Sequence, residues 1–287
     1  MTVNASGERG FSKPLAVILL CLASIAVALP FFGGTLRQFV RESLMQRVTS
    51  SHYEILCPPN ALSQDEMTEF ATRREHLFTA LDKKLGDSGS NMEIRIIFDP
   101  AFSVQAANAV GVEPYTVAET TIRTKLIGRN PQLPAAADAE ALLYVGWGQP
   151  GNAQIARWIA AWFAGNSDST ELGMAAAQVE QRLGHKKVES LLGDPGGEIS
   201  SPKDQSLLGS AWVSAIAEFG GLDAVKKLYA AKMAHPNIAD VTKALGTTPL
   251  ELDRKWQMWM YAYIAGMPPA PSDSGMQMDM PMPEGNR

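Results

Sequence analysis

The sequence predicts an α+β protein in which a small N-terminal sheet with helices is followed by a mainly α-helical half. One transmembrane helix is expected to precede both. The 287 residues are 46% hydrophobic, which is enough to bury a sizeable core. Apolar segments with strand-like alternation lie in the first half, and helical spacing of apolar residues dominates the second. A single long uncharged stretch near the N-terminus predicts the membrane helix.

The uncharged stretch runs from Leu15 to Gly34. Twenty residues at about 1.5 Å each reach roughly the 30 Å of a bilayer core. We therefore expect a transmembrane anchor at 14–34, after an N-terminal tail at 1–13. A cleaved signal peptide is the alternative, because Ala26-Val27-Ala28 is similar to a cleavage site. Basic residues flank the stretch on both sides, so charge does not decide its orientation.

The remaining chain divides into three expected parts: a juxtamembrane helix at 35–50, a folded domain at 51–266 and a flexible Met- and Pro-rich tail at 267–287. The domain is predicted to open with a strand at 52–57. A helix follows, because Ser63 and Glu66 have capping-box spacing and the apolar periodicity continues to Gly86. Further strands are expected at 92–98 and, more weakly, at 120–127.

Helices are predicted through the second half of the domain, at 135–145, 152–164, 170–183, 206–219, 222–233, 238–245 and 248–265. The last has the clearest start, with Thr248 as the cap and Glu251 closing the box. Four residues at helical spacing in this segment predict one buried stripe: Leu252, Trp256, Trp259 and Tyr263.

Charge and cysteine content exclude several classes of function. With 25 Lys and Arg against 30 Asp and Glu, the chain has no basic excess for phosphates, so nucleic acid is not an expected partner. The two cysteines are Cys21 and Cys57, and only Cys57 lies in the expected soluble part, so no disulfide can form within it. No Walker loop, G-x-S-x-G elbow or dinucleotide-binding G-x-G-x-x-G motif follows an expected strand.

Two segments carry a resemblance to a known family. Residues 209–232 read GSAWVSAIAEFGGLDAVKKLYAAK, and residues 241–260 read VTKALGTTPLELDRKWQMWM. Together with the order of the expected strands and helices, they resemble the peptidase MA-like domains of the gluzincin zinc metallopeptidases, over about residues 51–263. The resemblance implies that fold, and in active members a zinc-dependent peptidase.

Active gluzincins carry H-E-x-x-H on one helix and a ligand glutamate on the next, within Trp-Leu-x-Glu-Gly. Histidines four apart share a helical face and bind zinc, and the glutamate acts on the metal-bound water. If Glu140 matches that glutamate, the histidine positions hold Ala139 and Leu143. The next helix reads ARWIAAWFAG, with Ala161 at the ligand position. The resemblance therefore implies a catalytically degenerate domain without zinc, and not an enzyme.

A membrane-bound zinc metallopeptidase with unrecognised ligands is the alternative. His185 and Glu189 have the spacing of two ligands on one helical face, and His76 is a third candidate. Two lysines between His185 and Glu189 favour a solvated helix end instead. The segment Arg73-Arg74-Glu75-His76 is typical of an exposed helical face with local ion pairs.

The tail suggests a third function. Met276, Met278, Met280 and Met282 alternate with other residues, and thioethers are ligands that select Cu(I). In an extended segment these four side chains point the same way, so the tail is a candidate copper site. The competing interpretation is a low-complexity segment whose methionines bind no metal or give apolar contacts to a partner.

These observations predict a membrane-anchored, non-catalytic gluzincin-like domain that serves as a protein-interaction or accessory subunit, without a cofactor. It would present its former substrate cleft, or a helical face, to a protein partner or a membrane complex. The N-terminal position of the anchor and the family resemblance place the domain outside the cytoplasm, at a bacterial inner membrane.

Overall fold

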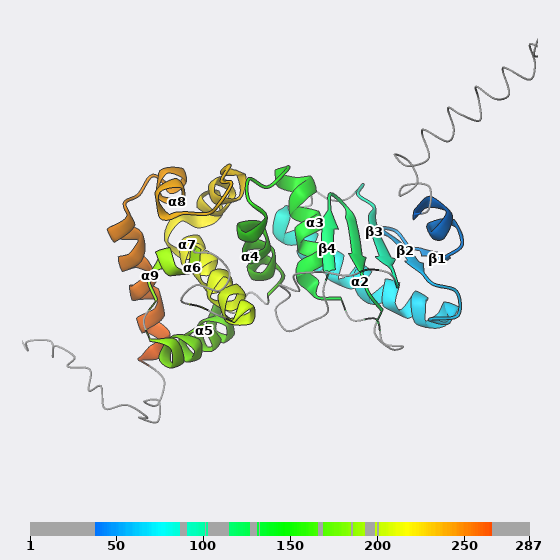
Figure 1. Ribbon diagram of the computed structural model, residues 1–287, viewed down its shortest axis with the longest axis horizontal. Coiled ribbons are helices and arrows are strands. Elements are labelled where there is room, and N and C mark those ends of the chain that lie inside the picture. Colours follow the sequence, from blue (N-terminus) through cyan, green and yellow to red (C-terminus); the bar gives the residue numbers. More distant parts are fainter. Residues whose placement is uncertain are drawn as a thin grey trace, which may run out of the picture.

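A computed structural model describes residues 38–86, 91–100, 102, 115–126, 131, 133–165, 169–184, 186–192, 199 and 201–265. Its strands are β1 (Gln46–Thr49), β2 (Tyr53–Cys57), β3 (Ile94–Phe98), β4 (Tyr115–Ala118) and β5 (Thr121–Thr124). Its helices are α2 (Gln64–Leu85), α3 (Ala135–Trp147), α4 (Ala153–Ala164), α5 (Ser169–Leu183), α6 (Val188–Leu192), α7 (Pro202–Ala230), α8 (Ile238–Leu245) and α9 (Pro249–Ile264). The molecule is elongated, with the sheet, α2 and α3 at one end, α5 to α9 at the other, and α4 between them (Figure 1).

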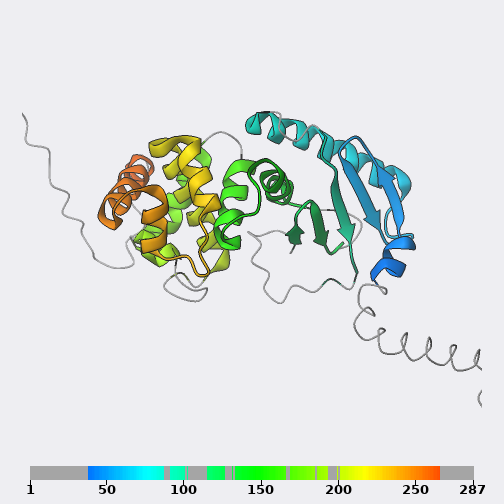
Figure 2. The ribbon, with the colours of Figure 1, turned by 90° about the horizontal axis from the view of Figure 1, so that it is seen from above.

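The five strands form one sheet in the order β1-β2-β3-β5-β4. The central strands β2, β3 and β5 are parallel, whereas β1 and β4 are antiparallel edge strands. The helix α2 connects β2 to β3 and lies across one face of the sheet (Figure 2). Consecutive central residues such as Ile96 and Ile97 are both fully buried, which is typical of parallel strands covered on both faces.

The structure corrects the predicted fold class. The sequence was expected to give an α+β protein with a preceding transmembrane helix, whereas β2, α2 and β3 form a parallel strand–helix–strand unit within a mixed α/β fold. Strand periodicity reports which residues are buried but not whether neighbouring strands run parallel, so the pattern did not reveal this unit. Across the described ranges, no helix combines the length and the apolarity needed to cross a membrane. The expected span at 14–34 lies outside them.

The helix predicted at 35–50 is also corrected. Residues 38–43 are helical, but Gln46–Thr49 is the edge strand β1, which pairs with β2 through Val48 and Ile55. Val48 is the one buried residue of this strand. A single buried side chain in four residues gives too little periodicity to distinguish a short edge strand from a helix.

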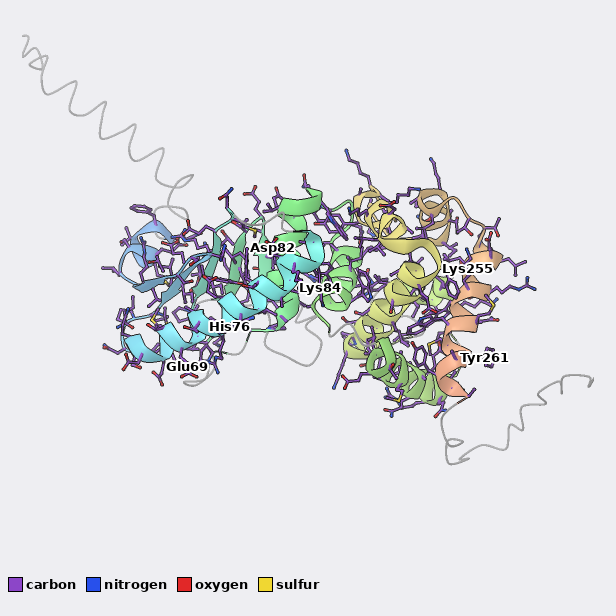
Figure 3. All side chains as sticks on the ribbon, turned by 180° about the vertical axis from the view of Figure 1, so that it is seen from behind. Glu69, His76, Asp82, Lys84, Lys255 and Tyr261 are labelled. Carbon is purple, nitrogen blue, oxygen red and sulfur yellow. The ribbon has the colours of Figure 1, made fainter. Side chains whose placement is uncertain are left out.

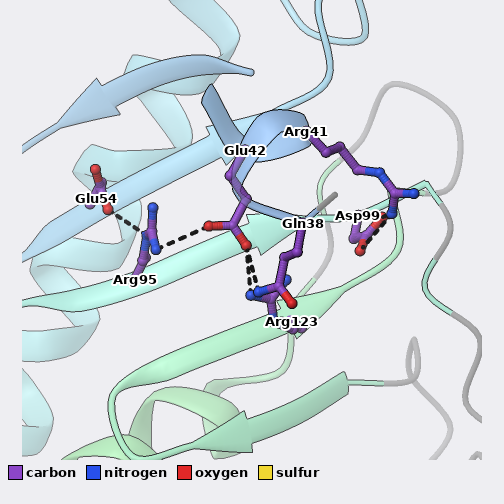
Figure 4. Close-up of polar contacts among 7 residues, drawn as sticks. All are labelled: Gln38, Arg41, Glu42, Glu54, Arg95, Asp99 and Arg123. Carbon is purple, nitrogen blue, oxygen red and sulfur yellow. Dashed lines mark hydrogen bonds and ion pairs between the residues drawn. The ribbon is translucent and has the colours of Figure 1, made fainter. Parts of the chain in front are cut away.

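Ion pairs fix residues 38–43 to the sheet (Figure 4). Glu42 lies 3.2 Å from Arg95 of β3 and 2.7 Å from Arg123 of β5, and it also accepts a hydrogen bond from Gln38. Arg95 in turn lies 2.6 Å from Glu54 of β2. Burial acts to raise the pKa of Glu42, but the hydrogen bonds from Arg123 and Gln38 outweigh it and hold that pKa below its usual range. The network therefore joins the segment to three central strands.

The predicted start and end of α2 are confirmed. The Ser63 hydroxyl accepts a hydrogen bond from the Glu66 N–H at 3.2 Å, and the Ser63 N–H donates to the Glu66 carboxylate at 2.6 Å. Gly86 ends the helix in the left-handed conformation, with φ of 81°. Between these ends, Met67, Phe78 and other apolar residues pack toward the sheet and α3.

The predicted helices of the second half are present, with two differences. The segments expected at 206–219 and 222–233 form one run, α7, which is broken at Gly221 by a φ of 68°. The short helix α6 was not predicted. In α9, Thr248 caps the first turn, and Leu252, Trp256 and Trp259 are buried as expected, whereas Tyr263 is half-buried.

Candidate functional site

The candidate site lies where α3 packs against α4, between the sheet and the helical half. Asn152 begins α4, because its side-chain oxygen accepts hydrogen bonds from the N–H groups of Gln154 and Ile155 at 2.9 and 3.1 Å. The indole of Trp158 on α4 meets that of Trp212 on α7 edge to face, with ring centroids 6.2 Å apart. Gly209 lies directly against Trp158, so α7 can approach α4 closely.

Hydrocarbon side chains occupy the positions at which the sequence resemblance places the zinc ligands of active gluzincins. Ala139 and Leu143 lie one helical turn apart on α3, and both are 0% exposed within the hydrophobic core. Ala161 on α4 is half-buried. Neither alanine nor leucine offers a lone pair to a metal ion. Within the part of the chain that the structure describes, no group of three or more His, Cys, Asp or Glu side chains is placed to hold a metal.

Glu140 lies between these positions in sequence and has an unusual environment. It is half-buried, and its Oε2 atom is inaccessible and has no hydrogen-bond partner among the described residues. Burial raises the pKa of Glu140 to about 7, although the positive charge of Arg157 on α4 acts in the opposite direction. Glu140 is therefore a carboxyl group that is partly protonated near neutral pH.

Two tyrosines surround this carboxyl group. The pKa of Tyr115 on β4 and that of Tyr229 on α7 are both raised, first by burial and then by the negative charge of Glu140. Arg157 makes no hydrogen bond within the described ranges, and it lines a cavity of about 240 Å³ between the first turns of α4 and α7. Of these groups, only Arg157 lines the cavity, and the Tyr229 hydroxyl already donates a hydrogen bond to the carbonyl of Gly148 at 3.1 Å. Arg157 can hydrogen-bond a polar ligand there, and the described groups of the site include no activated nucleophile.

Asp138, which precedes Ala139, has a structural role. Its carboxylate accepts hydrogen bonds from the Tyr53 hydroxyl on β2 and from Arg74 on α2, each at 2.7 Å. Arg74 also donates to the carbonyl of Leu133. Burial raises the pKa of Asp138, and the charge of Arg74 opposes that rise. These contacts fasten α3 to the sheet and to α2, and they set the position of Glu140.

The predicted exposure of the Arg73-Arg74-Glu75-His76 segment is correct only in part. Arg73 and His76 are exposed, and Figure 3 shows His76 on the outer side of α2. Arg74 is only 5% exposed, because it turns inward to Asp138. Glu75 is half-buried and accepts two hydrogen bonds from His52, each at 2.7 Å.

Two of the ligands proposed for an alternative zinc site, His76 and Glu189, lie in different halves of the molecule. His76 lies on α2 in the sheet-containing end, whereas Glu189 is exposed on α6 in the helical half (Figure 1). His185 lies outside the described residues. The tail methionines Met276, Met278, Met280 and Met282 also lie outside them, so the copper hypothesis stays a prediction.

Sequence reasoning did not single out Arg157, although a signal was present. Arg157 is the only charged residue between Asn152 and Ala164, and Asp138 and Glu140 are the only charged residues of α3. Charges in otherwise apolar helices are costly to bury, so they mark positions with a specific partner or role. That reasoning would have indicated all three residues.

Comparison of this chain with family models, with curated proteins and with solved structures gave no match in any of the three. The resemblance to the gluzincin peptidases therefore stays a prediction from the sequence. The geometry of Glu140, Arg157 and the buried Ala139 and Leu143 does not depend on it.

Proposed function

We propose that this protein is a non-catalytic, gluzincin-like pseudo-peptidase domain that acts as a protein-interaction or accessory subunit. The observation that carries the proposal is the burial of Ala139 and Leu143, at 0% exposure, where the resemblance places two zinc-binding histidines. Hydrocarbon in these positions packs the core and cannot bind a metal ion. Without a metal, Glu140 has no metal-bound water to act on.

Partner binding is proposed along the edge of the sheet beside Glu140. The strand β4 is an edge strand, and it packs against α3. Edge strands present backbone N–H and C=O groups that an extended segment of a partner can pair with. Tyr115 on β4, Glu140 and Arg157 would add side-chain hydrogen bonds to such a partner.

The location of the domain is proposed on the sequence alone. The uncharged residues 15–34 predict a membrane anchor. The family resemblance and the N-terminal position of this anchor favour a bacterial inner membrane with the folded domain on its extracytoplasmic side. Those residues lie outside the described part of the chain. An accessory subunit of a membrane complex is consistent with this expectation.

A first experiment tests the degenerate site by restoring it. The variant A139H/L143H/A161E supplies the three ligands that the resemblance requires, and Glu140 already holds the place of the base. Zinc titration should show no tight binding by the natural chain and about one zinc per folded variant. Circular dichroism checks that the variant folds, and A161E alone, at a half-buried position, serves as the control without histidines. One tightly bound zinc per natural chain would instead favour the metallopeptidase.

A second experiment locates the partner surface. A photo-crosslinking amino acid is placed at Thr116 on β4 or at Met258, which is 52% exposed on α9. Crosslinking in membranes, followed by mass spectrometry, should capture one polypeptide from position 116 and not from position 258. Equal capture from both positions, or from neither, would contradict binding at the β4 edge.

A further inference from the structure

A second pocket lies in the helical half, away from Glu140. It is lined by side chains of α7 and α9 and by residues at and just after the end of α8, among them Trp212, Phe219, Leu245, Leu252 and Trp256. Its cavity is about 80 Å³. Because pockets for small molecules usually enclose roughly 300 Å³ or more, this one suits a single inserted side chain. The lining is mainly apolar, and Lys255 is its one charged residue.

Two features of the lining indicate an occupant. Trp212 is fully buried, yet its indole N–H has no hydrogen-bond partner among the described residues. That nitrogen is also inaccessible, so an occupant of the pocket would contact the indole ring of Trp212 and not its N–H. Phe219, another lining residue, is 41% exposed, which is high for a large apolar side chain beside a pocket. An apolar side chain that packs on the ring of Trp212 and covers Phe219 suits both features.

The chain itself supplies a suitable side chain. Methionine is flexible, fills irregular apolar gaps and makes favourable contacts between its sulfur and aromatic rings. The C-terminal segment contains Met276, Met278, Met280 and Met282, and Asp279 among them can approach Lys255. These residues belong to the same chain as the pocket, so their local concentration there exceeds that of a separate partner.

The length of the segment permits this contact. From Trp256 to Ala265, α9 extends the chain by about 14 Å beyond the pocket. The eleven residues that follow, up to Met276, can span roughly 36 Å when extended. The extended segment is therefore longer than this part of α9. It can turn back along the helix, and any of the four methionines can reach Trp256.

We propose that one methionine of residues 276–282 inserts into the pocket between α7 and α9 and that its segment covers the exposed side chain of Phe219. This inference is independent of the proposed function, because it concerns the helical half and not the β4 edge. It assigns the Met-rich tail an intramolecular binding site.

Methyl NMR of the full-length chain with ¹³C-labelled methionine tests the insertion. A methyl group beside the rings of Trp212 and Trp256 should resonate upfield of the random-coil position. That resonance should disappear when the four tail methionines are changed to serine. It should also disappear in A224L, which fills the pocket from α7, and persist in A239L on the exposed side of α8. Random-coil positions for all four tail methyl groups would overturn the proposal, even if A224L failed to fold.

Disulfide trapping distinguishes the chain's own tail from that of a second copy. In a C21S background, Ala224→Cys is combined in turn with a cysteine at position 276, 278, 280 or 282. The natural Cys57 can be kept because it is fully buried. At least one pair should form an intramolecular disulfide faster than the same tail cysteine paired with Glu69→Cys on α2. Crosslinks only between chains, or equal rates for positions 224 and 69, would contradict the proposal.

Discussion

Glu140 places a carboxyl oxygen in the interior without a hydrogen-bond donor. Burial raises its pKa from 4.5 to about 7, so the folded protein retains a proton in this range that the unfolded chain has released. The contribution of Glu140 to stability is therefore fully present below about pH 4.5 and is lost as the pH rises through 7.

The substitution Glu140→Gln should remove this dependence. In the natural chain, the free energy of unfolding should decrease between pH 5 and pH 8. In Glu140→Gln this decrease should be smaller, by up to about 3 kcal/mol. Urea unfolding at several pH values measures it. Glu180, whose pKa burial also raises to about 7, will leave a residual slope of the same sign. The exposed Glu93→Gln is the control, and a profile for Glu140→Gln parallel to that of the natural chain would contradict the assignment.

Arg74 and Arg73 are adjacent in sequence but differ sharply in environment. Arg74→Met removes the cation that pairs with the buried Asp138, so we expect a loss of about 3–5 kcal/mol in the free energy of unfolding. Arg73 is exposed and lies 3.8 Å from Glu69, so Arg73→Met should cost about 0.5 kcal/mol or less. Urea titrations compare the two, and equal losses would refute the structural role of Arg74.

The two arginines also show that a sequence alone does not reveal whether a particular charged residue is buried. The apolar periodicity of the segment that forms α2 indicates a buried face, and Met67, Phe70 and Phe78 are buried there. Arg74 lies on that same face, but charge alone suggested exposure. Only the position of Asp138 on a distant helix, 64 residues later in the sequence, explains why a guanidinium group is buried there.

The close packing of α7 on α4 depends on the absence of a side chain at Gly209. A Cβ atom at Gly209 would lie 2.3 Å from the ring of Trp158, which is itself buried against Trp212. Alanine normally favours a helix over glycine by about 1 kcal/mol. Gly209→Ala should nevertheless destabilise the protein by about 1–2 kcal/mol, because overpacking outweighs that gain.

Gly173 on α5 provides the matched comparison for Gly209. A Cβ atom there would lie 2.5 Å from the ring of Tyr263, but Tyr263 is half-buried near the end of α9 and has room to move. Gly173→Ala should therefore be close to neutral in thermal unfolding. If Gly209→Ala were as well tolerated, α4 and α7 would not be held as closely as the structure places them.

Helices with capping signals were predictable from the sequence, and short strands were not. The caps Ser63, Asn237 and Thr248 all occupy the positions that side-chain oxygens take at helix starts. By contrast, β1 and β4 have four residues each, and their identity depends on the strands beside them. Residues 46–49 were accordingly assigned to a helix, and β4 was not predicted.

The candidate site lies where the two halves of the molecule meet. The sheet with α2 and α3 forms one end, the helical half forms the other, and α4 joins them beside Glu140 (Figure 1). The sequence predicted the positions of Ala139, Glu140, Leu143 and Ala161 through a resemblance. It could not supply the electrostatic interaction of Glu140 with Arg157 and Tyr115, because these residues lie on three different elements.

The metal content of the purified full-length protein tests the central claim most directly. Protein that is expressed with ample zinc and dialysed against a weak chelator should contain far less than one zinc per chain, as measured by elemental mass spectrometry. The same protein should not cleave peptides. The reconstituted A139H/L143H/A161E variant, treated identically, is the positive control. About one zinc per natural chain, accompanied by peptide hydrolysis that Glu140→Gln abolishes, would contradict the account.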